Sequence, residues 1–368
     1  MKGIICSDLY SVEEERSLTS NTLAVKELVD GAIAQGLNVE VVFRFFPIVT
    51  KRGIFWPRKR RINGILVCDI PKVGVRYCYS KLLTSLVVRL LGISGKWDFA
   101  VCHMVSNYEA AKKTLNDRIG KVILVAHQSD LRSDHLAWAL KTADGVLARS
   151  QAVAHQIQLA QNVKVDGVVW SGLAKNIFAK KSVIENKSGA SLELMTACNL
   201  IPLKNVLNSV RAFSKLKELE PSARFTIYGD GILMKDLRHL IVELGLEDSV
   251  SVKGFRPKQE VIECMRRAHI FVMPSAPETL GLAYLEAMAS GCVVIGHKGW
   301  GIDGIVKDGE SGFLVDEAGP EDIFEKMKRC VNRQAWLAIA DRSFEIVQRH
   351  GMEDSAHNYM KLVLKYAS

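Results

Sequence analysis

Short apolar runs alternate with helical patterns along this chain of 368 residues. Strands that alternate with helices of about 10–15 residues are typical of βαβ units on a parallel sheet. In the first half, the apolar runs predict strands at residues 3–6, 39–43, 65–70, 99–102, 122–126, 145–148 and 167–170. In the second half, they predict strands at residues 193–197, 224–228, 250–252, 269–273, 292–296 and 312–315. The alternation therefore predicts an α/β protein with two doubly wound parallel-sheet domains.

A polar, lysine-rich stretch separates the two halves. Its sequence, KNIFAKKSVIENKSG, lacks strong periodicity and ends in Ser-Gly, which indicates a linker. We therefore expect an N-terminal domain over residues 1–174, a linker over 175–190, a second domain over 191–350, and a C-terminal helix over 351–368 that packs back toward the first domain. Ligands of open parallel sheets bind beyond the carboxyl ends of the strands, so two facing domains predict a cleft there.

Composition excludes several other classes of protein. The longest apolar stretch, residues 82–95, is interrupted by Arg89 and is too short to span a membrane. The N-terminus MKGIICSDLY predicts a first strand and loop, not a secretory signal. The eight cysteines include no C-x-x-C pair, and the nine histidines show no metal-binding spacing. We expect a cytoplasmic protein with no metal site.

The positive charge is concentrated in the first half of the chain. Residues 1–172 carry 23 Lys and Arg against 15 Asp and Glu, whereas residues 173–368 carry 26 against 25. The densest part runs from Arg44 to Lys96 and includes KRGIFWPRKRR at residues 51–61. This stretch is either a solvated loop, an anionic membrane contact or a nucleic-acid site, and no nucleic-acid motif accompanies it. An amphipathic helix pattern follows, so we expect residues 51–91 to bind an anionic membrane surface and no nucleic acid.

The segment that says most about chemistry is HIFVMPSAPETLGLAYLEAMASG, residues 269–291. An apolar strand ends there, and Glu278 and the residue after it are expected to start a helix. The free N–H groups of a helix start form an anion site, and Gly281 permits close approach of a ligand. The amides expected to serve are those of Thr279, Leu280, Gly281 and Leu282. Glu286 follows about 10 Å further along the helix axis, so two carboxylates bracket a phosphate site.

Glu278 and Glu286, with seven residues between them, resemble the E-x7-E motif of the family 4 retaining glycosyltransferases of the GT-B fold. The neighbouring Pro274-Ser275, Gly281 and Gly291 also match that motif's surroundings. Residues 228–231, 252–255 and 308–315 are similar to further stretches of the family, among them the loop that contains Gly254. The resemblance is strong over residues 192–316 and looser before them. It implies a GT-B fold whose two Rossmann-like domains face a cleft.

One position departs from the family pattern. The family usually reads G-R-L-x-x-x-K after the first strand of this domain, and its Arg and Lys bind the donor diphosphate. Lys204 matches the Lys, but Asn199 stands where the Arg is expected. Asn can donate a hydrogen bond yet carries no charge. Arg256 and Lys298 are both candidates for the missing cation.

A second glycine pattern, Gly299 to Gly304, satisfies G-x-G-x-x-G directly after a predicted strand. A dinucleotide fingerprint needs a full crossover helix after it, and only three residues intervene before the Asp308-Gly309 turn. The pattern therefore does not predict NAD binding. The resemblance instead places Gly299 and Gly301 in a loop beside the donor sugar.

The first half resembles the family more weakly. Residues 98–130 are similar to the family's strand ending in His, a helix, and a strand ending in H-x-x-D. His127 would match the histidine that touches the donor sugar across the cleft, with Asp130 nearby. The usual Gly-Gly after the first strand is missing from residues 7–22.

The resemblance implies a retaining hexosyltransferase that uses a UDP-sugar or a GDP-sugar, without a metal. The diphosphate would lie on Lys204 and the 279–282 amides, Glu286 would hold the ribose, and Glu278 and His127 would orient the sugar. The acceptor would be a glycan or lipid-linked glycan of surface polysaccharide or lipopolysaccharide biosynthesis, met at the inner face of the cytoplasmic membrane. A catalytically inactive sugar-nucleotide-binding subunit and a sugar-nucleotide epimerase are the alternatives.

Overall fold

The computed structural model describes residues 1–10, 20–47, 49–50, 53–54, 56–72, 74–75, 78–79, 81–185, 187 and 191–368. The chain divides into two compact units. The first comprises residues 1–149, 153–172 and 352–368, and the second comprises residues 150–152 and 173–351. The C-terminal residues therefore belong to the first unit.

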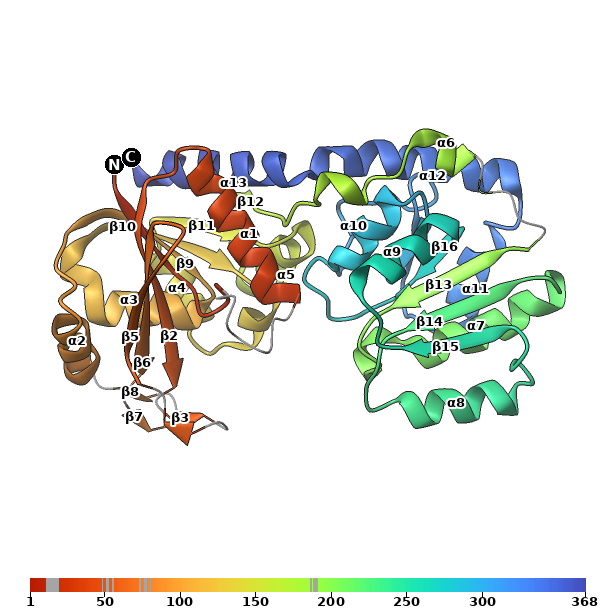
Figure 1. The fold of residues 1–368 in the computed structure, drawn as a ribbon, viewed down its shortest axis with the longest axis horizontal. Coiled ribbons are helices and arrows are strands. Elements are labelled where there is room, and N and C mark those ends of the chain that lie inside the picture. Colours follow the sequence, from red (N-terminus) through yellow and green to blue (C-terminus); the bar gives the residue numbers. More distant parts are fainter. Residues whose placement is uncertain are drawn as a thin grey trace. The chain divides into compact units, whose positions relative to one another are not determined.

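The first unit is built on an eight-stranded sheet (Figure 1). Its strands, in spatial order, are β12 (Gly167–Val168), β11 (Gly145–Ala148), β10 (Ile119–Ala126), β9 (Trp97–His103), β1 (Gly3–Cys6), β2 (Val39–Pro47), β6 (Ile65–Lys72) and β5 (Arg58–Ile62). All neighbours pair in parallel except β5 and β6, which pair antiparallel. Each of the seven predicted strands is present. Two short hairpins, β3 (Val49–Thr50) with β4 (Gly53–Ile54) and β7 (Gly74–Val75) with β8 (Cys78–Tyr79), accompany the sheet.

Helices cover both faces of this sheet, which is why its central strands are apolar on both sides. One core cluster joins the sheet to α2 (Lys81–Leu90), α3 (Val105–Leu115), α4 (Leu136–Thr142) and α5 (Gln151–Gln161). The other joins it to α1 (Ser20–Ala34) and α13 (Met352–Ala367). Short 3-10 turns occur at Asn116–Arg118 and Gln128–Arg132.

The basic stretch is not a loop in its described part. Residues Arg58–Ile62 form the edge strand β5, which returns into β6 through Asn63 and Gly64. Both turn residues have positive φ, 48° and 83°, as the tight turn of a two-residue hairpin requires. These residues therefore form a strand and not a loop, although most of them are exposed to solvent, while Lys51, Arg52 and Phe55 lie outside the described part of the chain.

The second unit is built on a six-stranded, wholly parallel sheet. Its strands, in spatial order, are β15 (Val250–Gly254), β14 (Arg224–Tyr228), β13 (Glu193–Ala197), β16 (Ile270–Val272), β17 (Val293–His297) and β18 (Phe313–Val315). Its helices are α6 (Lys181–Glu185), α7 (Val206–Leu219), α8 (Met234–Glu243), α9 (Lys258–Arg267), α10 (Leu282–Ala289), α11 (Pro320–Lys328) and α12 (Arg333–Val347), with 3-10 turns at Lys175–Ile177, Pro202–Lys204 and Gln348–His350. The six predicted strands are all present, so the doubly wound α/β class is confirmed for both units.

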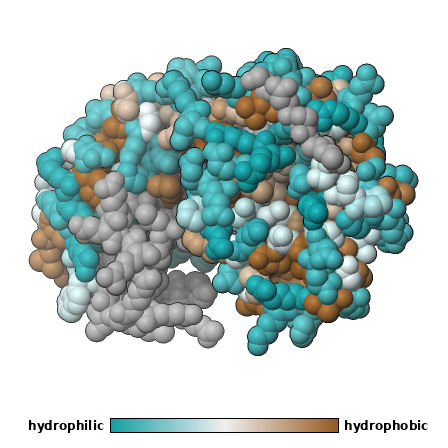
Figure 2. Space-filling view, turned by 45° about the vertical axis from the view of Figure 1, so that its right-hand side comes forward, coloured by the Kyte–Doolittle hydropathy of each residue, from teal (hydrophilic) through white to brown (hydrophobic). Residues whose placement is uncertain are grey.

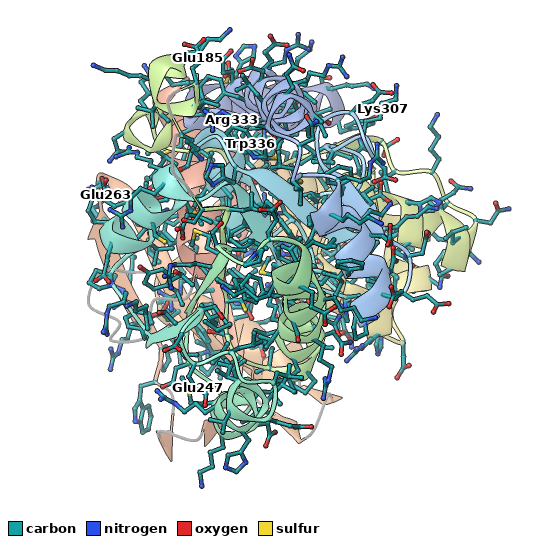
Figure 3. All side chains as sticks on the ribbon, turned by 90° about the vertical axis from the view of Figure 1, so that its right-hand side faces the viewer. Glu185, Glu247, Glu263, Lys307, Arg333 and Trp336 are labelled. Atoms are coloured by element: carbon teal, nitrogen blue, oxygen red, sulfur yellow. The ribbon has the colours of Figure 1, made fainter. Side chains whose placement is uncertain are left out.

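The described part of residues 175–190 packs into the second unit. Ile184 of α6 is fully buried, and the Lys187 ammonium donates to the carbonyls of Met265 and Ala268 at 3.1 and 2.6 Å. Arg333 donates to the carbonyl of Lys187 at 2.7 Å and lies over the Trp336 ring (Figure 3). The described part of the predicted linker is therefore packed within the second unit. Among the described residues, no helix is both long and apolar enough to cross a membrane.

Candidate functional site

The site predicted in the second half lies at the carboxyl ends of the second unit's strands. The strand order reverses between β13 and β16, which are neighbours in the sheet but not in the sequence. Lys204 lies in the segment after β13, and Glu278 lies in the segment after β16. Ligands of doubly wound sheets bind at such a switch point.

Glu278 does not start a helix, contrary to the sequence-based expectation. Helix α10 begins at Leu282, and Glu278 and Thr279 lie in the loop before it. Gly281 holds a left-handed conformation, with φ of 71°, and a helix cannot include a residue in that conformation. The glycine that the sequence marks as a close-approach position is therefore also the residue that sets where the helix begins.

Lys204 and Glu278, two of the predicted catalytic residues, form an ion pair with each other. Their side chains are 18% and 16% exposed, so the pair is shielded but reachable from solvent. The Glu278 carboxylate also accepts from the Thr279 amide at 3.0 Å and lies 3.4 Å from the Ser275 hydroxyl. Two backbone-anchored bonds join the loops: Ala276 N to Leu203 O at 3.0 Å, and Asn205 Nδ2 to Pro274 O at 2.8 Å.

Glycines pack tightly around the Glu278 side chain. A Cβ on Gly301 would lie 3.2 Å from Glu278 Cγ and equally close to the Tyr284 ring. A Cβ on Gly281 would lie 2.6 Å from that ring, which is buried and whose hydroxyl donates to the Met273 carbonyl. The Gly301 amide donates to the Glu278 carbonyl at 3.1 Å. The structure therefore brings together Glu278, Lys204, Gly281 and Gly301.

The G-x-G-x-x-G stretch is a series of turns, and no helix follows it until α11. Gly299 has φ of 80°, and its amide donates to Asp303 Oδ2 at 2.6 Å. This geometry lacks the crossover helix of a dinucleotide site. Gly254, at the end of β15, also has positive φ, and a Cβ there would meet nothing within 4 Å.

Glu286 makes its own ion pair, with Lys258 at 2.6 Å. Lys258 is the first residue of α9, directly after the loop that follows Gly254. Sequence reasoning missed this lysine, although its place after the β15 loop at a helix start was a usable signal. Leu280 is buried, so only its backbone can serve a ligand, and Thr279 and Leu282 are partly exposed.

Neither Arg256 nor Lys298 is an unpaired substitute for the missing arginine. Asn199 is exposed, and its carbonyl accepts from the Ile201 amide at 2.9 Å. Both candidate cations have acidic partners: Arg256 pairs with Glu260 at 3.4 Å, and Lys298 pairs with Asp316 at 2.9 Å. Exposed pairs of this kind contribute little to stability, so a bound anion can compete for either cation.

His127, the predicted site residue of the first unit, lies in a buried polar cluster after β10. Its Nε2 is 3.3 Å from His103 Nδ1, and His103 Nε2 is 2.9 Å from the Tyr359 hydroxyl. Burial, with the nearby Arg149 cation, lowers the pKa of His103 to about 3 and lowers the pKa of His127 well below its ordinary value. Both imidazoles are therefore neutral at pH 7. The sequence did not point to His103 or Tyr359 as partners of His127.

Two further members complete this cluster. The Asp130 carboxylate accepts from the amides of His127 at 2.8 Å and Val105 at 3.1 Å, which fastens the loop after β10 to the start of α3. Burial raises the Asp130 pKa to about 6. Arg149 is buried and donates to Val169 O at 3.3 Å and to the Ser171 hydroxyl, and burial lowers its pKa to about 10.

Metal-ligating side chains do not gather in the part of the chain that the structure describes: no three His, Cys, Asp or Glu residues there could hold an ion together.

Two curated proteins illustrate the sequence relationships. A Salmonella typhimurium protein, named as a colanic acid biosynthesis glycosyltransferase, is 33% identical over 152 residues, which cover 40% of this chain and 37% of that protein. The alpha-monoglucosyldiacylglycerol synthase of Streptococcus pneumoniae is 24% identical over 237 residues, which cover 62% of this chain and 52% of that protein. The chain thus spans less than two thirds of the length of these relatives.

Solved structures match the fold of the whole chain. Sucrose-phosphate synthase from Thermosynechococcus elongatus matches with a TM-score of 0.74 at 16% identity, covering 99% of this chain and 98% of that one. Anabaena HepE in complex with UDP also matches with a TM-score of 0.74, at 19% identity, covering 99% of this chain and all of that one. Residues 178–342 match the family described as Glycosyl transferases group 1. In this part the chain is therefore similar to the group 1 glycosyltransferases, and the chain has the GT-B fold.

Proposed function

We propose that the protein is a retaining hexosyltransferase that moves a sugar from a UDP-sugar or GDP-sugar to a glycan or lipid-linked glycan of surface polysaccharide biosynthesis. The observation that carries this proposal is the Lys204–Glu278 pair at the switch point of the second sheet. The pair has the two charges that a sugar diphosphate needs: a cation for the phosphates and a carboxylate for the sugar hydroxyls.

In this proposal, groups of the bound donor break two ion pairs of the structure, Lys204–Glu278 and Lys258–Glu286. Its diphosphate takes Lys204 away from Glu278 and lies near the backbone amides of residues 279–282. The freed Glu278 carboxylate then accepts from sugar hydroxyls. In the same way the ribose diol takes Glu286 away from Lys258, and the displaced lysine faces the nucleotide. In this proposal, each of the two ion pairs thus occupies a position that the donor takes when it binds.

Charge develops on the diphosphate as the glycosidic bond opens. Donors already aimed at that position stabilise the transition state more than the ground state, and removing one such donor typically costs about 10²–10³ in turnover. Lys204 and the amides supply this stabilisation, so the proposal includes no metal. His127 would orient the sugar from the first unit in its neutral form, and the cleft between the units stays a prediction.

The experiment that tests this function identifies the products. The purified protein is incubated with radiolabelled UDP-sugars and GDP-sugars, with and without a bacterial lipid extract. Release of the nucleoside diphosphate together with label in a glycan or lipid supports the proposal. Conversion of the donor into a different nucleotide sugar would mean an epimerase, and donor binding without any product would mean an inactive binding subunit. Either result would overturn the proposal.

We further propose that the acceptor is lipid-linked and that the first unit docks on the inner face of the cytoplasmic membrane. The charge asymmetry of the chain supports this, as does the exposure of Trp56, which is 70% accessible. The Streptococcus pneumoniae relative is itself named for a diacylglycerol glycolipid. Basic charge beside interfacial aromatic and apolar residues suits an anionic bilayer.

The structure sharpens the test of this docking. Within β5, Arg60 is ion-paired to the buried Asp69 at 2.5 Å, so replacing it would disturb the fold. The informative variant therefore replaces Arg58, Lys59 and Arg61 with Ser and keeps Arg60. It should bind anionic vesicles more weakly than wild type, and wild-type binding should fall with salt because such contacts are screened within about 8 Å. Equal binding to neutral and anionic vesicles would contradict the proposal.

A further inference from the structure

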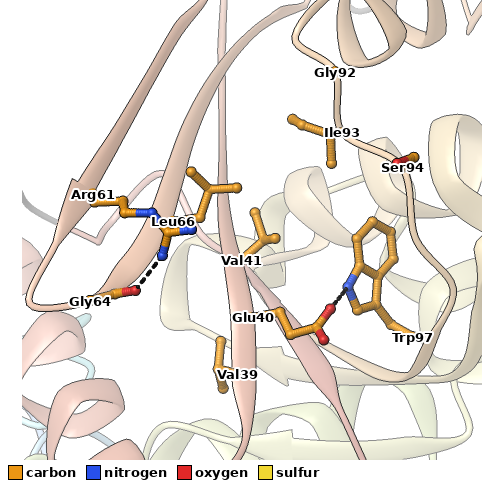
Figure 4. Close-up of a pocket in the computed structure, with 10 residues that line it drawn as sticks. All are labelled: Val39, Glu40, Val41, Arg61, Gly64, Leu66, Gly92, Ile93, Ser94 and Trp97. Carbon is orange, nitrogen blue, oxygen red and sulfur yellow. Dashed lines mark hydrogen bonds between the residues drawn. The ribbon is translucent and has the colours of Figure 1, made fainter.

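A pocket of about 390 Å³ lies at the amino ends of β2, β6 and β9 (Figure 4). This volume is within the range of about 300–1,000 Å³ that small-molecule sites occupy. His127 follows the carboxyl end of β10, whereas the pocket lies at the opposite ends of the strands. It is therefore separate from the predicted sugar-transfer site. Its lining residues are Val39, Glu40, Val41, Arg61, Gly64, Leu66, Gly92, Ile93, Ser94 and Trp97.

Apolar and polar side chains both line the pocket. Val39, Val41, Ile93 and Trp97 belong to the buried core, and Leu66 packs against it. Glu40, the acidic residue that lines the pocket, already has two partners. Its Oε2 accepts from Trp97 Nε1 at 3.0 Å, and its Oε1 lies 3.5 Å from the Lys2 ammonium. A hydrocarbon group can therefore occupy the pocket without desolvating an unpaired carboxylate.

Two cations of β5 flank the pocket. Arg61 lines it, is exposed, and donates to the Gly64 carbonyl at 3.1 Å, as the dashed line in Figure 4 marks. Lys59 is also exposed and donates to the Leu91 carbonyl at 3.1 Å, one residue before the lining turn at Gly92. Alternate residues of a strand share one face, so Lys59 and Arg61 point to the same side of β5.

Exposed leucines of α2 adjoin the side of β5 that carries Lys59 and Arg61. Leu90 is 77% exposed and Leu86 is 50% exposed, and Leu90 directly precedes the turn that lines the pocket. Val88 of the same helix is buried in the core that Leu66 and Trp97 contact. Apolar patches interrupt a mainly hydrophilic surface elsewhere too (Figure 2), but here they adjoin a pocket and two cations.

We propose that this pocket binds a single anionic phospholipid, with the phosphate on Lys59 and Arg61 and part of an acyl chain against Leu66 and Trp97. The inference rests on the proposed membrane docking and deepens it: docking would then select anionic lipid through a defined pocket, not through diffuse charge alone. A zwitterionic lipid adds a cation next to Lys59 and Arg61, so it should bind more weakly.

The test uses dihexanoyl phosphatidylglycerol below its critical micelle concentration, titrated calorimetrically into the full-length protein. Dihexanoyl phosphatidylcholine and inorganic phosphate are titrated in parallel. We expect saturable binding of the phosphatidylglycerol, about tenfold weaker binding of the phosphatidylcholine, and no measurable binding of phosphate, because free phosphate has no chain to place against Leu66 and Trp97. Phosphate binding as tight as that of the anionic lipid would overturn the inference.

Three variants locate the site. Arg61→Gln should weaken phosphatidylglycerol binding about tenfold, and Leu66→Trp, which fills the pocket, should abolish it. Lys141→Gln, which changes an exposed lysine of α4, is the matched control and should bind as wild type. Because a filled pocket can lower stability, Arg61→Gln decides the outcome if Leu66→Trp fails to fold. Unchanged binding in Arg61→Gln would overturn the inference.

The result is distinguishable from failure of the proposed function. Sugar transfer is measured in the same samples, and the pocket and the Lys204–Glu278 pair belong to different units. Loss of transfer with intact lipid binding would overturn only the enzymatic proposal. Vesicle binding that persists in Arg61→Gln and Leu66→Trp would leave membrane docking in place and overturn the pocket.

Discussion

At the scale of single residues, the candidate site depends on how little space surrounds Glu278. Gly301 has φ of 56°, and a Cβ there would press on the Glu278 side chain at 3.2 Å. The glycine is thus needed twice, once for its backbone conformation and once for its missing side chain. A substitution there lowers stability through backbone strain and changes the site through contact with Glu278. The two effects can therefore be measured separately.

We expect Gly301→Ala to lower turnover at least tenfold, because Glu278 must shift. The matched control is Gly245→Ala, where φ is 63° but a Cβ would meet nothing within 4 Å. Both variants should lose about 1–2 kcal/mol of unfolding free energy from left-handed strain. Urea unfolding and donor turnover, measured on both proteins, check this. Equal turnover in the two variants would contradict the role of Gly301.

The His103 imidazole predicts a pH dependence of stability. Its pKa is about 3 in the folded protein against 6.5 for an ordinary histidine, so between these values the unfolded state binds a proton that the folded state does not. Stability from this group is therefore lost as the pH falls below about 6.5. His103→Gln should flatten the slope of unfolding free energy against pH by about 1.4 kcal/mol per unit between pH 4.5 and 5.5. Urea titrations across that range measure it, and an unchanged slope would refute the assignment.

At the scale of elements, β5 shows how a charged stretch is built into a sheet. Asp69 is buried beside Arg60, and Arg44 approaches its other oxygen at 3.3 Å. Arg44 is buried as well, so the carboxylate compensates a cation that water cannot reach. Arg44 and Arg60 belong to the basic stretch, but they pair with Asp69 inside the first unit and do not contribute to a binding surface.

Asp69→Asn should therefore destabilise the protein by about 3–5 kcal/mol, because it leaves buried positive charge uncompensated. Asp117→Asn, at an exposed position, should change the unfolding free energy by no more than about 0.5 kcal/mol. Chemical denaturation of the two variants makes the comparison. If both variants unfolded like wild type, the buried ion cluster would have no structural role.

Particular elements show what could be read from the sequence. The thirteen apolar strands were predictable because parallel strands that are buried on both faces form continuous apolar runs. β5 was missed because its residues, RKRRI, lack that signal, although the Asn63-Gly64 pair after it marks a hairpin. The start of α10 was placed too early, since the conformation of Gly281 depends on contacts with Tyr284 that sequence spacing does not reveal. The cluster of His103, His127 and Tyr359 joins residues 256 positions apart, beyond any local pattern.

At the scale of the whole molecule, positive charge and donor chemistry belong to different parts of the chain. Residues 1–172 carry almost all of the net charge of +9. The site proposed for the donor has its own local cations, Lys204 and Lys258. We therefore expect the proposed transfer reaction to need no metal to neutralise the diphosphate.

We accordingly expect turnover to be unchanged in excess EDTA, measured as release of the nucleoside diphosphate. Prior dialysis against EDTA serves as a stricter version of the same experiment. Activity that disappears on chelation and returns with magnesium or manganese would contradict the proposed role of Lys204.

The measurement that tests the central claim most directly is donor turnover in Lys204→Ala and Glu278→Ala. Their matched controls are Lys215→Ala and Glu321→Ala, which break an exposed ion pair of the same unit. We predict that the two site variants fold normally and lose about 10²–10³ in turnover, as expected for groups that stabilise or orient a transition state, and that the two controls act as wild type. Wild-type turnover in both Lys204→Ala and Glu278→Ala would contradict the account.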